Sequence, residues 1–198
     1  MENKLGITDD KLLTQADERI SKQGAAMLFD SGRLNTLPVG KFAGLQEIHS
    51  ALFGNIYPFA GEIRTVNVYK GGMMFTPVEG IDNAVRFADI LPHREFGEIV
   101  DKFIHMNTVH PFRYGNGRAM RIWLDVMFAD AVGAIVDWRR VDKDKYNRAV
   151  EKSALDKREL FALLSTSLTE QIDRDTYLRG IDASFALEGL CAYSVARG

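Results

Sequence analysis

The sequence has 198 residues, 46% hydrophobic and 26% charged, which suits one soluble domain large enough to bury a core. Its formal net charge of −2 offers no general attraction to nucleic acid or to a membrane surface, and no apolar run approaches the roughly 20 residues of a membrane span. The single cysteine, Cys191, excludes an intramolecular disulfide and a multi-cysteine metal site, and it fits a reducing compartment. With the polar start MENKLGITDD, which has no signal-peptide core, these features indicate a cytoplasmic protein that binds neither membrane nor nucleic acid directly.

Long stretches of helical periodicity and only five prolines predict an all-α fold in a single domain. Helices are expected at residues 10–30, 39–54, 81–91, 94–110, 118–132, 145–155, 158–172 and about 173–190. The segment 118–132 is apolar nearly all round and should therefore be the buried central helix. Pro111 ends the helix before it, because the residue that precedes a proline is disfavoured in helical geometry.

One region departs from helical periodicity. In 64–77, Val66 and Val68, and then Met74 and Thr76, recur at every second position on either side of Lys70-Gly71-Gly72, which favours a short β-hairpin. Because an isolated hairpin is marginally stable in water, we expect an exposed flap on a helical body.

The stretch VHPFRYGNGRAMR (109–121) has the features of a phosphate pocket. The glycine-rich turn 115–117 stands at a helix start, where backbone N–H groups lack intrahelical partners and carry partial positive charge. Arg118 and Arg121 lie on one side of the first turn and could fork onto phosphate oxygens. His110 could accept a hydroxyl proton as a general base near pH 7.

A plainer interpretation of the same stretch stays open at this point. The glycine turn could simply join two packed helices, and the two arginines could belong to a solvated face. For the turn alone we favour that interpretation. The whole set of features favours a binding site, because they coincide at the entrance of the most apolar helix.

HPFRYGNGR (110–118) resembles the signature of the Fic family, HPFx(D/E)GN(G/K)R, which a second arginine often follows. FAGEIR (59–64) and KGGMMF (70–75) are similar to the segment before the family's flap and to the flap itself. SFALEG (184–189) is similar to a C-terminal inhibitory motif, (S/T)xxxE(G/N). The resemblance covers about residues 40 to 190, and the chain is identified as a member of the Fic family with its own inhibitory helix.

The resemblance implies an α-helical domain that transfers AMP from ATP to a protein hydroxyl and releases pyrophosphate. The catalytic residues would be His110, Asn116 and Arg118. The nucleotide-binding residues would be Phe112, Gly115, Asn116, Gly117, Arg118 and Arg121. Of these, 115–117 would hold the α-phosphate, Arg118 the β-phosphate and Arg121 the γ-phosphate, while Phe112 would mainly anchor the loop in the core.

The resemblance also implies a docking surface and a regulatory segment. The flap would bind an extended target segment by strand addition through Lys70, Gly71, Gly72, Met73, Met74 and Phe75. Ser184 and Glu188 are four residues apart, so we expect them on one face of the last helix. Glu188 would pair with Arg121 and displace the γ-phosphate, which would make the protein autoinhibited without a partner. The plain alternative is an ordinary surface glutamate.

Tyr114 departs from the family pattern, which has Asp or Glu at this place to help hold Mg²⁺. A phenol is neutral at pH 7 and is a poor metal ligand. We therefore expect weak, weakly metal-dependent AMP transfer, unless Tyr114 packs beside the adenine or the flap and another residue contacts the metal. Transfer of another nucleotide, removal of AMP, nucleotide binding alone and a non-enzymatic helical module are the alternatives. A type II topoisomerase subunit is a plausible target by resemblance, and a homo-oligomer is left open.

Overall fold

A computed structural model describes residues 1–70 and 73–197, without the side chains of Lys70 and Met73. Gly71 and Gly72, expected at the tip of the flap, lie outside the described residues. The helices are α1 (Asp10–Asp30), η1 (Arg33–Thr36), α2 (Phe42–Phe53), α3 (Val78–Ile90), α4 (Phe96–Val109), α5 (Asn116–Val132), η2 (Trp138–Arg140), α6 (Lys143–Lys152), α7 (Arg158–Ser165) and α8 (Arg174–Ala186). The strands are β1 (Tyr69–Lys70), β2 (Met73–Met74), β3 (Ile135–Val136) and β4 (Leu168–Thr169), so the expected helical fold with a small hairpin is confirmed.

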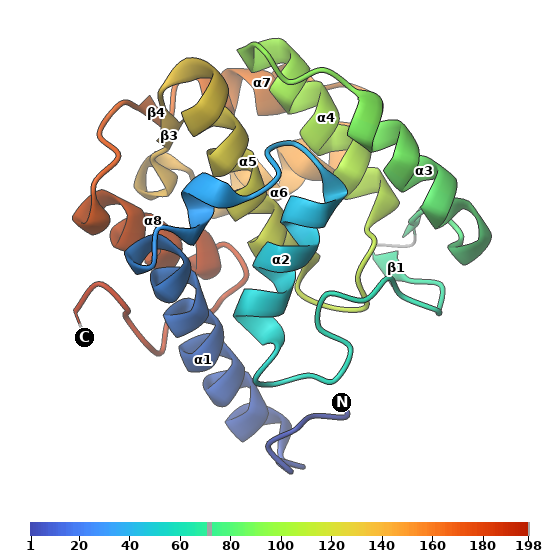
Figure 1. Ribbon diagram of the computed structural model, residues 1–198, viewed down its shortest axis with the longest axis vertical. Helices are drawn as coiled ribbons and strands as arrows, with labels where there is room; N and C mark the ends of the chain where they lie inside the picture. The colour runs from blue at the N-terminus through green and yellow to red at the C-terminus, as the bar shows by residue number, and fades with distance from the viewer. Residues whose placement is uncertain (71–72, 198) are drawn as a thin grey trace.

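Helix α5 is the centre of the molecule (Figure 1). Nearly every side chain from residue 116 to 128 is buried, and the helix packs against α2, α4, α8 and β3. Trp123 is buried and donates a hydrogen bond from its indole nitrogen to the carbonyl of Lys41, 3.2 Å away. This confirms the prediction that the segment apolar on all sides forms the buried central helix.

Helix α1 carries buried charge as well as apolar packing. Asp9 caps its start by accepting a hydrogen bond from the Leu12 amide at 2.8 Å. Leu13 and Ala25 pack into the core from the same helix that buries Asp17 and Lys22. Because α1 lies against both α2 and α8 (Figure 1), these buried charges meet partners from distant parts of the chain.

The β-structure differs in two respects from the expectation. The hairpin pairs Tyr69 with Met74 in antiparallel register, and it is shorter than 64–77. The expected helix 158–172 ends early at Ser165, and the chain then forms β4, which pairs with β3. Ser165 and Thr166 each hydrogen-bond back to the carbonyl of Ala162, at 3.0 Å in both cases, and such local bonds compete with helix continuation.

The last helix also ends earlier than expected. The amide of Leu190 bonds back to the carbonyl of Phe185 at 3.3 Å, and Gly189 takes a left-handed φ of 84°, which is how helices commonly end. Glu188 therefore lies in the turn just after α8 and not within the helix, although it faces the same side as Ser184, since both contact Arg121. The turn still directs both side chains toward α5, as their contacts below show.

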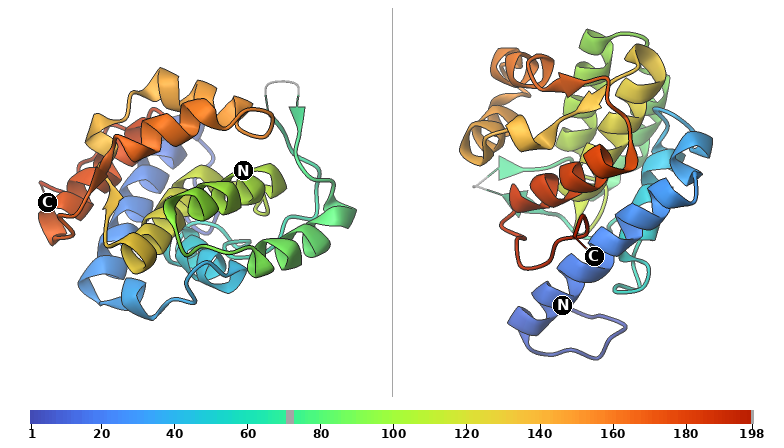
Figure 2. Two further views of the ribbon diagram at one scale, coloured as in Figure 1. Left: turned by 90° about the horizontal axis from the view of Figure 1, so that it is seen from above. Right: turned by 90° about the vertical axis from the view of Figure 1, so that its left-hand side faces the viewer.

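Figure 2 shows the hairpin at the edge of the helical body, away from the two chain ends. Its base is fastened to the end of α4, because the amide of Thr76 donates to the carbonyl of Thr108 at 3.2 Å. Across the described ranges, no helix combines the length and apolar character needed to traverse a bilayer.

Candidate active site

His110 ends α4 in a left-handed conformation. Its φ of 51° is positive, and no other non-glycine residue of the described chain shares this feature. Its amide still bonds to the carbonyl of Met106 at 3.0 Å, and Pro111 follows, so the helix stops and the chain turns toward α5. The ring of Phe75, from the strand end of the flap, stacks on the imidazole with centroids 3.8 Å apart. The flap therefore lies directly over the histidine.

Arg64 ties the base of the flap to the histidine. The side chain is 3% exposed, and its guanidinium donates to the carbonyls of Val66 and Thr76 on the flap side. On the other side it donates to the carbonyls of Val109 and His110, the latter at 2.8 Å. Sequence reasoning quoted Arg64 only as part of a family-like segment and missed this role, since its acceptors are backbone atoms that no side-chain motif reveals.

Asn116 closes the signature loop. Its side-chain oxygen accepts from the amide of Phe112 at 2.9 Å, and its side-chain nitrogen donates to the carbonyl of Phe112 at 2.7 Å. Gly115 has a φ of 74°, and a β-carbon there would lie 2.5 Å from the ring of Phe53, so only glycine fits. Phe112 is fully buried and does not line the cavity, so it anchors the loop rather than contacting a nucleotide.

His49 supports the loop from beneath. Its Nε2 donates to the carbonyl of Tyr114 at 2.8 Å, while its Nδ1 accepts from the amide of Gly61 at 2.8 Å. This pairing requires a neutral ring, and burial lowers the pKa of His49 to about 4. It is a core histidine that links the loop to the segment before the flap.

Glu188 lies at the first turn of α5. Its Oε1 is 2.7 Å from Nη2 of Arg121, and a β-carbon on Gly117 would come within 2.6 Å of the same oxygen. Arg121 is nearly fully buried and also donates from Nε to the hydroxyl of Ser184 at 2.7 Å. A carboxylate thus rests where the helix start offers its partial positive charge.

Arg118 has a different partner. Its side chain is fully buried, and its two terminal nitrogens each lie 3.1 Å from a carboxylate oxygen of Asp17 on α1. The hydroxyl of Tyr114 donates to the same carboxylate at 2.8 Å. The alternative of a solvated arginine face is therefore wrong. Of the two arginines, only Arg121 lines the cavity in this structure, while the terminal nitrogens of Arg118 are directed at Asp17.

The side chains at the loop do not fit a magnesium site. Burial raises the pKa of Tyr114 to about 12, so its hydroxyl is a neutral donor. Asp17 is fully buried, and its carboxylate is already paired with the guanidinium of Arg118. In the part of the chain that the structure describes, no group of three or more His, Cys, Asp or Glu side chains could hold a metal ion.

These residues surround a cavity of about 340 Å³. Its walls come from the flap, the signature loop, α5 and α6, with these members among them: Phe75, His110, Gly117, Met120, Arg121, Tyr146, Asn147, Val150 and Glu188. The lining therefore combines a cationic group, Arg121, with apolar and aromatic groups. A nucleotide has a corresponding division between its phosphates and its base.

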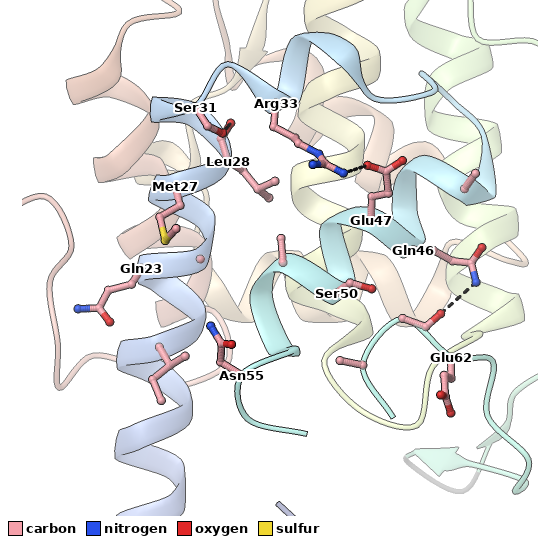
Figure 3. Close-up of a pocket in the computed structure, with 16 residues that line it drawn as sticks. Gln23, Met27, Leu28, Ser31, Arg33, Gln46, Glu47, Ser50, Asn55 and Glu62 are labelled. Carbon is pink, nitrogen blue, oxygen red and sulfur yellow. Dashed lines mark hydrogen bonds and ion pairs between the residues drawn. The ribbon is translucent and has the colours of Figure 1, made fainter. Parts of the chain in front are cut away.

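A larger groove of about 860 Å³ lies elsewhere, between α1 and α2 (Figure 3). Its lining mixes polar and apolar residues, and Arg33 and Glu47 form an ion pair at its wall, 2.8 Å apart. The signature loop does not contribute to this groove. Size alone would have indicated the wrong site, whereas convergence of titratable and cationic groups indicates the smaller cavity.

Comparison with known proteins agrees with this geometry. The model of the Fic/DOC family matches residues 41–128, which include the signature loop and most of α5. The protein adenylyltransferase VbhT of Bartonella schoenbuchensis is 33% identical over 187 residues, covering 86% of this chain and 37% of that protein. The chain contains a Fic/DOC family domain. The chain spans little more than a third of the length of VbhT. It is also 29% identical to the probable protein adenylyltransferase Fic of Escherichia coli K12, and that match covers 78% of the chain and 80% of that protein.

The solved structures support the same fold. The BepC protein of Bartonella tribocorum, determined with bound AMPPNP, is 22% identical to this Fic protein with a TM-score of 0.69. The match covers 86% of this chain and 93% of that one. At this identity the likeness establishes the Fic fold, and the chemistry rests on the residues of the site itself.

Proposed function

We propose that this Fic protein is a protein adenylyltransferase, which transfers AMP from ATP to a hydroxyl side chain of a target protein and is restrained by its own C-terminal segment. The observation that carries the proposal is the carboxylate of Glu188, 2.7 Å from Arg121 and against Gly117. An anion held at a helix start beside an arginine marks a place where a phosphate would also bind. The names of the relatives, protein adenylyltransferases, support ATP as the substrate.

The proposed reaction needs a base, a phosphate site and a leaving-group site. The target hydroxyl loses its proton to His110, and its oxygen forms a bond to the α-phosphorus. The bond from that phosphorus to the bridging oxygen of the β-phosphate breaks, and pyrophosphate leaves with the bonding electrons. Backbone N–H groups of 115–117 stabilise the charge on the α-phosphate, and Arg121 binds the terminal phosphate.

The flap supplies the proposed docking surface. Tyr69 pairs with Met74, and one edge of this two-stranded ladder has no neighbouring strand among the described residues. An extended target segment could add to that edge, with Met74 and Phe75 beside the cavity. Since Phe75 stacks on His110, a hydroxyl on the docked segment would arrive next to the base.

Autoinhibition is supported by the way the chain after α8 is held. Lys22 of α1 lies 2.9 Å from Glu18 and 3.2 Å from Asp182, and it also donates to the carbonyl of Tyr193 at 2.5 Å. Glu18 accepts from the amides of Ala192 and Tyr193 at 3.1 and 3.0 Å. Residues on both sides of Glu188 are thereby fastened to α1, so the restraint needs no second protein.

Labelled ATP tests the proposal. With the full chain carrying Glu188→Gly and a cell lysate, label on the α-phosphate should appear on protein and label on the γ-phosphate should not. His110→Ala in the same background should reduce the α-label about 10²–10⁴-fold while ATP still binds. Transfer of γ-label would indicate a kinase. Purified type II topoisomerase subunit, the target that the resemblance suggests, is one defined substrate for this assay.

A second candidate is a Fic protein with weak transfer, and the contact of Tyr114 with Asp17 favours it. The position that carries a carboxylate in the family pattern holds a neutral phenol here, bonded away from the cavity at 2.8 Å. The rate of α-label transfer across a magnesium titration separates the candidates. Weak transfer with little metal dependence supports the second, and ATP binding without any transfer would leave only a nucleotide-binding protein.

A further inference from the structure

The carboxylate of Asp17 collects three hydrogen bonds from two residues of the signature stretch. Nη1 and Nη2 of Arg118 each approach one of its oxygens at 3.1 Å. The hydroxyl of Tyr114 donates to Oδ2 at 2.8 Å. Asp17 and Arg118 are both fully buried, so this ion pair is shielded from water and is held by geometry as well as by charge.

These contacts fix the orientation of the Arg118 guanidinium. Nη1 also donates to the hydroxyl of Ser21 at 3.2 Å, so both terminal nitrogens are directed at α1. The rings of Phe53 and Tyr114 lie 4.6 and 5.0 Å from the guanidinium carbon. The one remaining nitrogen, Nε, is buried and makes no hydrogen bond of normal geometry, and it lies 3.4 Å from Oε2 of Glu188.

We propose that Asp17 is a positioning residue, held by Tyr114, which orients Arg118 so that Nε faces the place now taken by the Glu188 carboxylate. When a nucleotide takes that place, Nε donates to one of its β- or γ-phosphate oxygens. The inference rests on the proposed function, because it assigns the phosphates of ATP to the Glu188 position. It also gives Tyr114 a role of its own: the phenol supports a carboxylate on α1 where the family pattern has a carboxylate on the loop.

The sign of the effect on ATP binding distinguishes positioning from simple charge. Asp17→Asn removes a negative charge near the phosphate site, so electrostatics alone would tighten ATP binding. Positioning predicts the opposite, because Arg118 loses its bidentate partner and no longer holds Nε toward the phosphates. AMP lacks the β- and γ-phosphates, so its affinity should not change.

The experiment measures the affinities of ATP and AMP for the full chain by calorimetry, in a Glu188→Gly background. We expect Asp17→Asn to weaken ATP binding about ten-fold and Tyr114→Phe about three-fold, with AMP affinity unchanged. The double variant should be no weaker than Asp17→Asn, because Tyr114 acts through Asp17. Tyr177→Phe, which removes another buried tyrosine hydroxyl bonded to the carbonyl of Ala25, is the control and should leave both affinities unchanged.

Unchanged or tighter ATP binding in Asp17→Asn, equal loss of ATP and AMP affinity, or additive losses in the double variant would each overturn the inference. If Asp17→Asn does not fold, Tyr114→Phe decides alone, because it keeps the ion pair and the ring: a selective loss of ATP affinity supports positioning, and no selective loss contradicts it. Failure of the proposed function would look different, since Glu188→Gly itself would then bind no ATP or would bind it without α-label transfer.

Discussion

Glu188 and Arg121 form the contact that joins the C-terminal segment to the phosphate end of the cavity. Their charged atoms are 2.7 Å apart, with Arg121 buried and the Glu188 side chain about one third exposed at 35%. The arginine is thus rigidly held, and the glutamate is the partner that can leave. The surrounding contacts determine how readily it does so.

Ser184 should contribute a small part of this restraint. Ser184→Ala removes the acceptor for Nε of Arg121, 2.7 Å away, but leaves the carboxylate of Glu188 in place. Because one such bond contributes about 1 kcal/mol, we expect basal α-label transfer to rise about three- to five-fold. Ser165→Ala, at an exposed position on α7, is the matched control. An increase equal in both variants, or a decrease in Ser184→Ala alone, would contradict this role.

The buried charges on α1 should hold the segment after α8. Lys22→Met leaves Glu18 and Asp182 without their shared cation, so we expect the free energy of unfolding to fall by about 3–5 kcal/mol. Arg174→Met removes an exposed ion pair to Asp30, which also joins α8 to α1, and should cost far less because solvent screens it.

Urea unfolding of the two variants measures this difference. Similar losses in Lys22→Met and Arg174→Met would show that the buried network contributes no more than a surface pair. A folded Lys22→Met protein should also show higher basal transfer than Arg174→Met, because the segment around Glu188 is then less firmly held.

His49 should make stability depend on pH. In the folded protein burial lowers its pKa to about 4, whereas the unfolded chain has the ordinary value of 6.5. Below pH 6.5 the unfolded state binds a proton that the folded state excludes. The stability that the neutral His49 ring contributes is therefore fully present above pH 6.5. It is lost as the pH falls toward 4, by up to about 3 kcal/mol. Unfolding free energies of wild type and His49→Gln across this window provide the measurement.

The His49→Gln variant should lack this part of the pH dependence, while His105→Gln, which removes a half-buried histidine bonded to the carbonyl of Ala84, should retain it. Identical slopes for wild type and His49→Gln would contradict the assignment.

Arg64 should matter for catalysis more than for nucleotide binding. A lysine at this position cannot reach the two flap carbonyls and the two α4 carbonyls at once. In the Glu188→Gly background, Arg64→Lys should lower transfer at least about ten-fold, because His110 and the flap lose their alignment. ATP affinity should stay within about two-fold. Arg86→Lys, on the exposed side of α3, controls for the substitution, and an equal fall of affinity and rate would indicate a general structural defect instead.

Sequence patterns predicted those elements whose conformation is determined by residues close together in the chain. The α1 boundaries, 10–30, and the burial of α5 follow from helical periodicity, capping and apolar content. The segment 158–172 was mistaken for one helix, because pairing of Leu168–Thr169 with a strand more than thirty residues away decides its conformation. Likewise α8 ends before Glu188, because the turn that closes at Gly189 begins earlier than the sequence pattern predicts.

The signature stretch was found from its composition, whereas its supports were not. Asp17 lies about a hundred residues from Arg118, and Arg64 bonds only to backbone carbonyls, so neither contact is visible as a motif. One signal was present: Leu13, Asp17 and Ala25 recur at helical spacing on one face of α1. A charge in the middle of an apolar helical face has to find a buried partner.

The most direct measurement is the initial rate of α-label transfer to lysate protein by the full chain with Glu188→Gly, compared with wild type and with the exposed-site control Glu170→Gly. Loss of a charge-assisted pair with Arg121, worth about 1.5–3 kcal/mol, predicts a rise of about ten-fold or more in Glu188→Gly and none in the control. Equal rates in the three proteins, with ATP bound equally well by each, would contradict the claim that Glu188 restrains a nucleotide transferase.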